Sequence, residues 1–130
     1  MKNKFPFITL SQSLLLLRIA VPFMLIAHAV IRITGGTIGR FANFLEERGF
    51  IFGLAIVWLI TIVELAGGIL MMLGYYTRWI AAIFIVQLTL GIIIIHAAKG
   101  WFVGEHGTGG VEYSLVLIVA LVVIAAADKK

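Results

Sequence analysis

Two charged residues of this 130-residue chain lie inside long apolar stretches, where ionised side chains are costly and usually functional. Arg18 and Glu64 are each flanked by runs of Leu, Ile, Val and Ala. A charge at membrane depth costs ~2.5–3.5 kcal/mol on insertion scales. By helical rise, Arg18 lies about 8 Å and Glu64 about 4 Å from the middle of its own segment, both toward the same side. We predict an Arg18–Glu64 ion pair, which acts either as a structural clamp or in ligand binding.

A proline supports an inward-facing position for Arg18. Pro22 has no N–H, so the carbonyl of Arg18 loses its helical partner and becomes an acceptor inside a helix bundle. At ~100° per residue, one stripe of this helix holds Arg18, Pro22, Leu25, Ala29 and Arg32. We expect this stripe to face the neighbouring helices.

A second polar group is expected near the opposite ends of the apolar segments. It consists of His28, Arg32, His96 and Glu112, which could bind a polar head group, relay protons or hold a metal. Metal-ligand spacing is absent, because His96 and His106 are ten residues apart across a glycine-rich loop, and no metal is predicted. We predict ligand binding by the four residues. The alternative is that each is a separate interfacial residue that snorkels or caps.

The elements that must position these residues follow from composition. The chain is 62% hydrophobic and 12% charged, whereas soluble domains have roughly 45–50% apolar and ~25% charged residues. The stretch 79–98 carries no charge and is long enough to cross a bilayer. Because peptide groups in lipid must be satisfied internally, continuous apolar runs of this kind predict helices.

We predict an all-α membrane protein, a single domain over residues 1–130 with four transmembrane helices. Approximate spans are 14–33, 51–72, 79–97 and 111–127. A polar start at residues 9–13 can cap the first helix, and 34–36 (Thr-Gly-Gly) ends it. Gly67 and Gly68 allow a neighbouring helix to approach the second span closely.

The segment 37–48 between the first two spans is too polar to cross a membrane. Ile38, Phe41 and Leu45 fall on one stripe, with charged residues elsewhere. This pattern is typical of a short helix in the plane of the interface, with an irregular loop as the alternative.

Orientation follows from the Lys and Arg counts of the loops. With four spans, one side holds Lys2, Lys4, Arg78, Lys129 and Lys130. The other side holds Arg40, Arg48 and Lys99, offset by Glu46, Glu47 and Glu105. Both termini are therefore predicted to face the cytoplasm.

Other features exclude several classes of function. The chain has no cysteine, which excludes disulfides and thiolate metal sites. Its formal charge of +4 is scattered and indicates contact with membrane lipid, with no stripe for nucleic acid. Gln87, Gly91 and Ala98 could meet another subunit, so a homo-oligomer stays open. The first apolar run is too long for a cleaved signal peptide and is interrupted by Arg18.

Four pieces of the chain together resemble the DoxX family of small four-helix bacterial membrane proteins. They are 15–18 with Ala27 and His28; 64–68 with Gly74, Thr77 and Arg78; His96 with Gly100 and Phe102; and 109–112. The resemblance implies a bacterial inner-membrane subunit of a membrane-associated redox system. In one branch of the family, a DoxX-like protein pairs with another subunit to oxidise thiosulfate and pass electrons to quinone.

No tightly bound cofactor is evident from the sequence, so redox chemistry would need a quinone or a partner oxidoreductase subunit. We therefore expect the bundle to hold a quinone-like or lipid-like molecule, with any enzyme activity dependent on a partner. One alternative is a non-catalytic scaffold for a soluble oxidoreductase. The other is a small transporter with Glu64 as the coupling carboxylate, which no inverted repeat supports.

Overall fold

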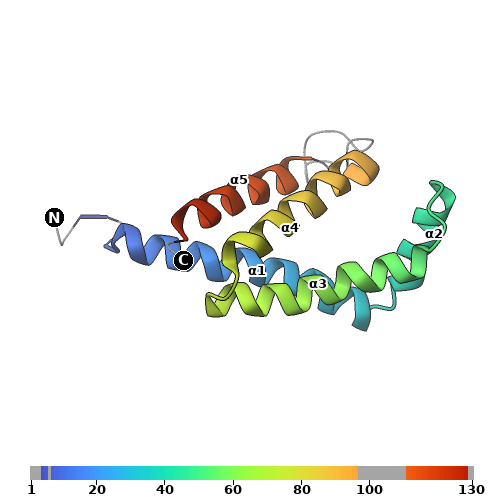
Figure 1. Cartoon of the computed structure of the whole chain (residues 1–130), viewed down its shortest axis with the longest axis horizontal. Helices are drawn as coiled ribbons and strands as arrows, with labels where there is room; N and C mark the ends of the chain where they lie inside the picture. The colour runs from blue at the N-terminus through green and yellow to red at the C-terminus, as the bar shows by residue number, and fades with distance from the viewer. Residues whose placement is uncertain (1–3, 6, 97–110, 129–130) are drawn as a thin grey trace. The chain divides into compact units, whose positions relative to one another are not determined.

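The computed structural model describes residues 4–5, 7–96 and 111–128, and within these ranges every regular element is helical. The elements are α1 (Leu10–Thr34), α2 (Ile38–Glu47), α3 (Gly53–Leu73), α4 (Thr77–Gly91), the π-helix η1 (Ile92–His96) and α5 (Glu112–Ala127) (Figure 1). The chain divides into two compact units. We call Met1–Val21 with Tyr76–Lys130 the terminal unit and Pro22–Tyr75 the central unit. Each is described by itself.

The all-helical prediction is confirmed, and three of the helices are long and apolar enough to cross a membrane. They are α1, α3 and the stretch Thr77–Ile94, which joins α4 to most of η1. Helix α5 has 16 residues, which corresponds to about 24 Å of axis, and is a shorter apolar helix. The fourth crossing therefore stays a prediction.

Both ends of α1 follow from local sequence. Thr9 and Gln12 form a reciprocal cap, in which the backbone N–H of Gln12 donates to Thr9 Oγ1 at 3.1 Å and that of Thr9 to Gln12 Oε1 at 2.8 Å. The helix starts four residues before the predicted span. At its other end Gly36 has φ +69°, a left-handed conformation that glycine adopts without strain. The predicted cap and the predicted stop are both confirmed.

Within the central unit, α1 and α3 approach closely at Gly68. A Cβ atom placed on Gly68 would lie 2.7 Å from Ile26 Cγ1 and 3.3 Å from the carbonyl oxygen of Pro22. The absence of a side chain therefore lets the two helices meet, as the sequence predicts for this glycine. Pro22, Leu25 and Ala29 are buried, which confirms the inward-facing stripe over this part of α1.

Helix α2 confirms the short helix predicted for 37–48. It packs against the start of α3, where a Cβ on Gly53 would overlap the carbonyl oxygen of Ala42. Ile38, Ala42 and Leu45 are buried, and Phe41 is half-buried. The placement of α2 in the interface plane stays a prediction.

In the terminal unit, α4 and α5 pack side by side through apolar faces (Figure 1). Ile80, Ala81 and Phe84 of α4 are buried, as are Leu117, Leu121 and Ile124 of α5. Arg78 Nη2 donates to the backbone carbonyl of Asp128 at 3.0 Å, which ties the start of α4 to the end of α5.

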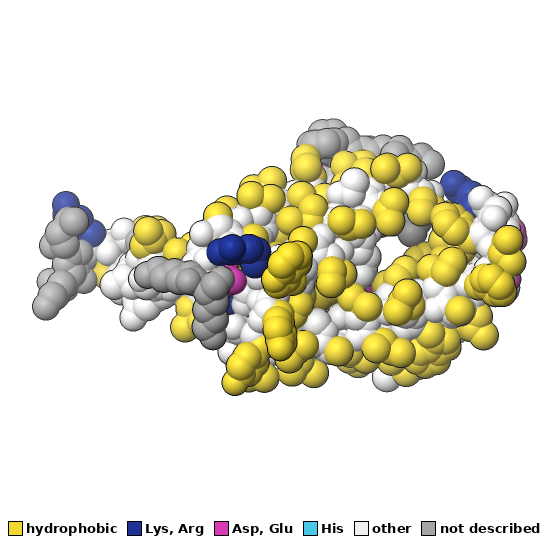
Figure 2. Space-filling view, in the orientation of Figure 1, with side chains coloured by type: hydrophobic (Ala, Val, Ile, Leu, Met, Phe, Trp, Pro, Cys, Tyr) yellow, Lys and Arg dark blue, Asp and Glu magenta, His cyan; other side chains and the backbone are white. Residues whose placement is uncertain are grey.

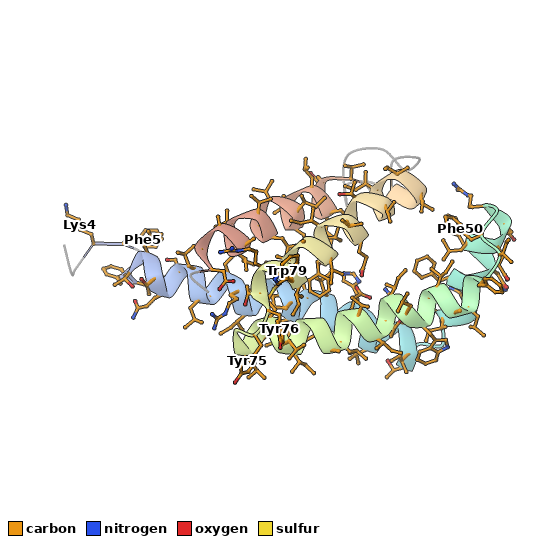
Figure 3. The ribbon with its side chains drawn as sticks, viewed as in Figure 1. Lys4, Phe5, Phe50, Tyr75, Tyr76 and Trp79 are labelled. Atoms are coloured by element: carbon orange, nitrogen blue, oxygen red, sulfur yellow. The ribbon has the colours of Figure 1, made fainter. Side chains whose placement is uncertain are left out.

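The outer surfaces of the helices are apolar. Val116 and Ile93 are 66% and 67% exposed, and hydrophobic side chains cover much of the face drawn in Figure 2. Tyr75, Tyr76 and Trp79 stand exposed at the turn between α3 and α4 (Figure 3). Apolar surface with aromatic residues at helix ends is the pattern of a protein surrounded by lipid.

Candidate functional site

An ion pair joins α1 to α3 inside the central unit. Arg32 Nη1 donates to Glu64 Oε1 at 2.8 Å. The Glu64 side chain is 3% exposed and that of Arg32 is 15% exposed, so the carboxylate is buried while the guanidinium stays partly accessible. Such a pair persists only where each charge offsets the desolvation of the other and further hydrogen bonds complete it.

Thr61 supplies one of those further hydrogen bonds. Its Oγ1 donates to the carbonyl oxygen of Val57 at 2.8 Å and accepts from Arg32 Nη1 at 2.9 Å. Because its own proton is committed to the backbone, the threonine oxygen is held as an acceptor for Arg32. Thr61 is fully buried, one turn before Glu64, so a single face of α3 carries both acceptors.

The segment after α1 holds Arg32 from other directions. The guanidinium carbon lies 5.6 Å from the centroid of the Phe41 ring on α2, a cation–π contact. The Arg32 carbonyl accepts from the backbone N–H of Thr37 at 3.1 Å and from its hydroxyl at 3.5 Å. Arg32 is thus a positioned side chain, whose guanidinium is restrained by α2 and α3 together. We call Arg32, Phe41, Thr61 and Glu64 the Arg32 cluster.

The structure pairs Glu64 with Arg32, a residue that the sequence analysis assigned to the second polar group. Arg18 and Arg32 are fourteen residues apart on α1, about 21 Å of helix axis. Arg18 belongs to the terminal unit and Glu64 to the central unit, so an Arg18–Glu64 contact stays a prediction. Arg18 Nε is buried without a hydrogen-bond partner in the described part of the chain.

The register of α1 and α3 explains why sequence reasoning missed Arg32 as the partner. Glu64 lies eleven residues after the start of α3, whereas Arg32 lies two residues before the end of α1. Gly68 faces Pro22 and Ile26, so Glu64 lies about one turn from the level of Arg32, and α3 begins several residues beyond the end of α1. The depths predicted from sequence were measured from the middle of each span, which amounts to placing the middles of the two spans at one level.

The other predicted ligand residues are divided between the two units. His28 is exposed on α1, one turn before Arg32 in the central unit. Glu112 opens α5 in the terminal unit and is half-buried. His96 ends η1, but its side chain lies outside the described residues, as does all of 97–110 with His106. The four-residue site of His28, Arg32, His96 and Glu112 stays a prediction.

Thr61 and Phe41 are site residues that the sequence analysis did not select. Thr61 precedes Glu64 by three residues, and this spacing on an apolar helix is a signal that could have found it. Phe41 was assigned to the apolar stripe of α2. Within the described ranges, no group of three or more His, Asp or Glu residues is arranged to hold a metal.

In the Arg32 cluster, Glu64 balances the charge of Arg32, and the Arg32 guanidinium stays partly accessible between two apolar helices. The cluster can hold a polar group of a membrane-soluble molecule, but it contains no nucleophile activated by a base. No curated protein and no solved structure was found to match the chain. The DoxX family model matches residues 13–97, which include most of α1, all of α2, α3 and α4, and all four residues of the Arg32 cluster. Because this match extends over more than half of the sequence, the chain belongs to the DoxX family.

Proposed function

We propose that this DoxX protein is a bacterial inner-membrane subunit that holds a quinone-like or lipid-like molecule for a membrane-associated redox system. The observation that carries the proposal is the Arg32–Glu64 ion pair with Thr61, a buried polar group between helices of membrane-spanning length. Charged groups at such positions are expensive and mark binding or transport sites. A quinone needs an apolar slot with one or two polar groups at its ring carbonyls, which Arg32 can supply.

The protein itself contributes binding and position, and a partner supplies the electrons. Its sequence shows no motif for a flavin, haem or iron–sulfur cluster, so a quinone or a second subunit must carry the redox step. The proposal therefore makes the chain one part of an oxidoreductase, with the partner either soluble or in the membrane.

Mass spectrometry of molecules that co-purify with the protein in detergent tests this proposal. We expect a quinone or a single enriched lipid in stoichiometric amount. Ordinary membrane phospholipid in bulk proportions would contradict ligand binding and favour the non-catalytic scaffold.

The predicted site at His96 and Glu112 has its own test. His96→Ala and Glu112→Gln should each weaken binding of a quinone analogue with little change in thermal stability, whereas the exposed control Glu46→Gln should not. Unchanged affinity in both variants would remove these residues from the site.

We further propose four crossings with both termini in the cytoplasm. The apolar outer face of α5 supports the fourth crossing, and the excess of Lys and Arg near the termini supports the orientation. A periplasm-dependent phosphatase fused to the C-terminus should be inactive, and the same reporter inserted after Arg40 should be active. Activity at the C-terminus would contradict the orientation or the number of crossings.

A further inference from the structure

The donors of Arg32 are unequally used. A guanidinium has five N–H groups, two on each Nη and one on Nε. In Arg32, the two hydrogen bonds from Nη1 go to Thr61 and Glu64, at 2.9 and 2.8 Å. No hydrogen bond from Nε or Nη2 to any residue in the described ranges is present. Glu64 therefore binds at the end of the guanidinium and leaves its Nε–Nη2 edge unused.

This unused edge is accessible. The Arg32 side chain is 15% exposed, and its Nε and Nη2 atoms are not fully buried. The guanidinium carbon lies 5.6 Å from the centroid of the Phe41 ring, and this cation–π contact uses none of the N–H groups of the edge. The two N–H groups on this edge can donate either to a single oxygen atom or to two oxygen atoms side by side.

The charge of the cluster favours a neutral ligand over an anionic one. Glu64 already balances Arg32, so the pair has no net charge in a low-dielectric environment. An anion on the Nε–Nη2 edge would lie within one guanidinium width of the Glu64 carboxylate and repel it. A carbonyl oxygen accepts both N–H groups through its two lone pairs without adding charge.

We propose that the Nε–Nη2 edge of Arg32 donates two hydrogen bonds to a carbonyl oxygen of an uncharged, membrane-soluble ligand. Thr61 and Glu64 act as positioning residues, because they fix Nη1 and thereby aim the opposite edge. The inference rests on the proposed function and adds to it the atoms that bind and a preference for neutral head groups. A quinone ring and a lipid ester both carry the required oxygen.

Binding of three probes to the full-length protein in detergent micelles tests the inference by calorimetry. The probes are a short-tailed benzoquinone, dioctanoylglycerol and dioctanoyl phosphatidate. We expect binding of at least one neutral probe and weaker binding of the anionic phosphatidate. The preferred neutral probe identifies the source of the carbonyl as quinone or lipid ester. Tighter binding of phosphatidate, or no binding of either neutral probe, would overturn the inference.

The matched variants are Arg32→Lys and Arg40→Lys. Lysine can keep the ion pair with Glu64, but it lacks the two N–H groups of the Nε–Nη2 edge. Arg32→Lys should therefore weaken binding of the neutral probe by about tenfold or more. Arg40 is exposed on α2, and its replacement by lysine should leave affinity unchanged. Equal affinities in the two variants would contradict the assigned edge.

Thr61→Val keeps the tested edge and removes one anchor of Nη1. It should weaken binding of the neutral probe less than Arg32→Lys does. If Arg32→Lys does not fold, Thr61→Val provides the test. Unchanged affinity in Thr61→Val would reject the positioning role. If a quinone co-purifies equally with wild type and with folded Arg32→Lys, the proposed function stands and this inference fails. If no ligand co-purifies and no probe binds, both fail.

Discussion

Helices α3 and α5 bury stripes of similar spacing but different chemistry. The buried face of α3 carries Thr61, Glu64 and Gly68 between the apolar Val57 and Met71, whereas that of α5 carries Leu117, Leu121 and Ile124 and one small polar residue, Ser114. Glu64 requires an opposite charge at one position on α1, and Gly68 requires close approach of that helix. The three apolar residues of α5 require only complementary shape from α4. In lipid, where apolar contact gives no net hydrophobic drive between helices, polar pairing specifies a neighbour more strictly than apolar packing does.

The largest effect is expected where the charge pair is broken. Arg32→Met and Glu64→Gln should each lower the free energy of unfolding, by about 3–5 kcal/mol for a fully buried pair and less for partly exposed Arg32. The double variant should lose less than the sum of the two. Denaturant titration in mixed micelles measures the three losses.

A parallel cycle with Arg18→Met and Glu64→Gln compares the observed partner with the one predicted from sequence. Coupling in the Arg32 cycle should exceed that in the Arg18 cycle. Equal or larger coupling with Arg18 would support the predicted pair and contradict the geometry of the Arg32 cluster.

A somewhat smaller loss is expected for the apolar pair of helices. Phe84 of α4 is fully buried, and Phe84→Ala should cost about 3 kcal/mol through lost van der Waals contacts and a cavity. Phe23→Ala, at an exposed position on α1, is the control and should change stability little. A loss in Phe84→Ala as small as in the control would mean that α4 and α5 do not depend on this packing.

Close approach of α1 and α3 can be tested with two glycines. Gly68→Ala should cost about 1–3 kcal/mol, because the added methyl group meets Ile26 and the Pro22 carbonyl. Gly39→Ala on α2 meets no atom within 4 Å and should be neutral, or stabilising by about 0.5–1 kcal/mol through helix propensity. Thermal melting followed by circular dichroism compares them, and equal shifts would contradict the tight contact.

The smallest effect is expected at the tie between α4 and α5. Arg78 is exposed, and its hydrogen bond to the Asp128 carbonyl is open to water. Arg78→Gln should therefore change the free energy of unfolding by about 1 kcal/mol or less. A loss approaching that of Phe84→Ala would show that the polar tie, and not apolar packing, holds these two helices.

Much of the fold was predictable from residues that act locally. Thr9 and Gln12 cap α1, and glycines 35 and 36 end it, because caps and left-handed turns depend on a few adjacent residues. The stripe through Pro22, Leu25, Ala29 and Arg32 follows from helical periodicity alone, and the amphipathic pattern of 37–48 predicts α2. Each of these predictions needs only the geometry of a single helix.

The partner of Glu64 could not be obtained in this way. Sequence reasoning identified both Arg18 and Arg32 as residues on the inner face of α1, but the choice between them depends on how far α3 is displaced along α1. In the central unit Gly68 of α3 lies against Pro22 and Ile26 of α1, and this register brings Glu64 within reach of the Arg32 side chain. A displacement of several residues changes no local pattern in either helix. It does change which side chains meet. The partner of a buried charge such as Glu64 therefore depends on how the helices pack.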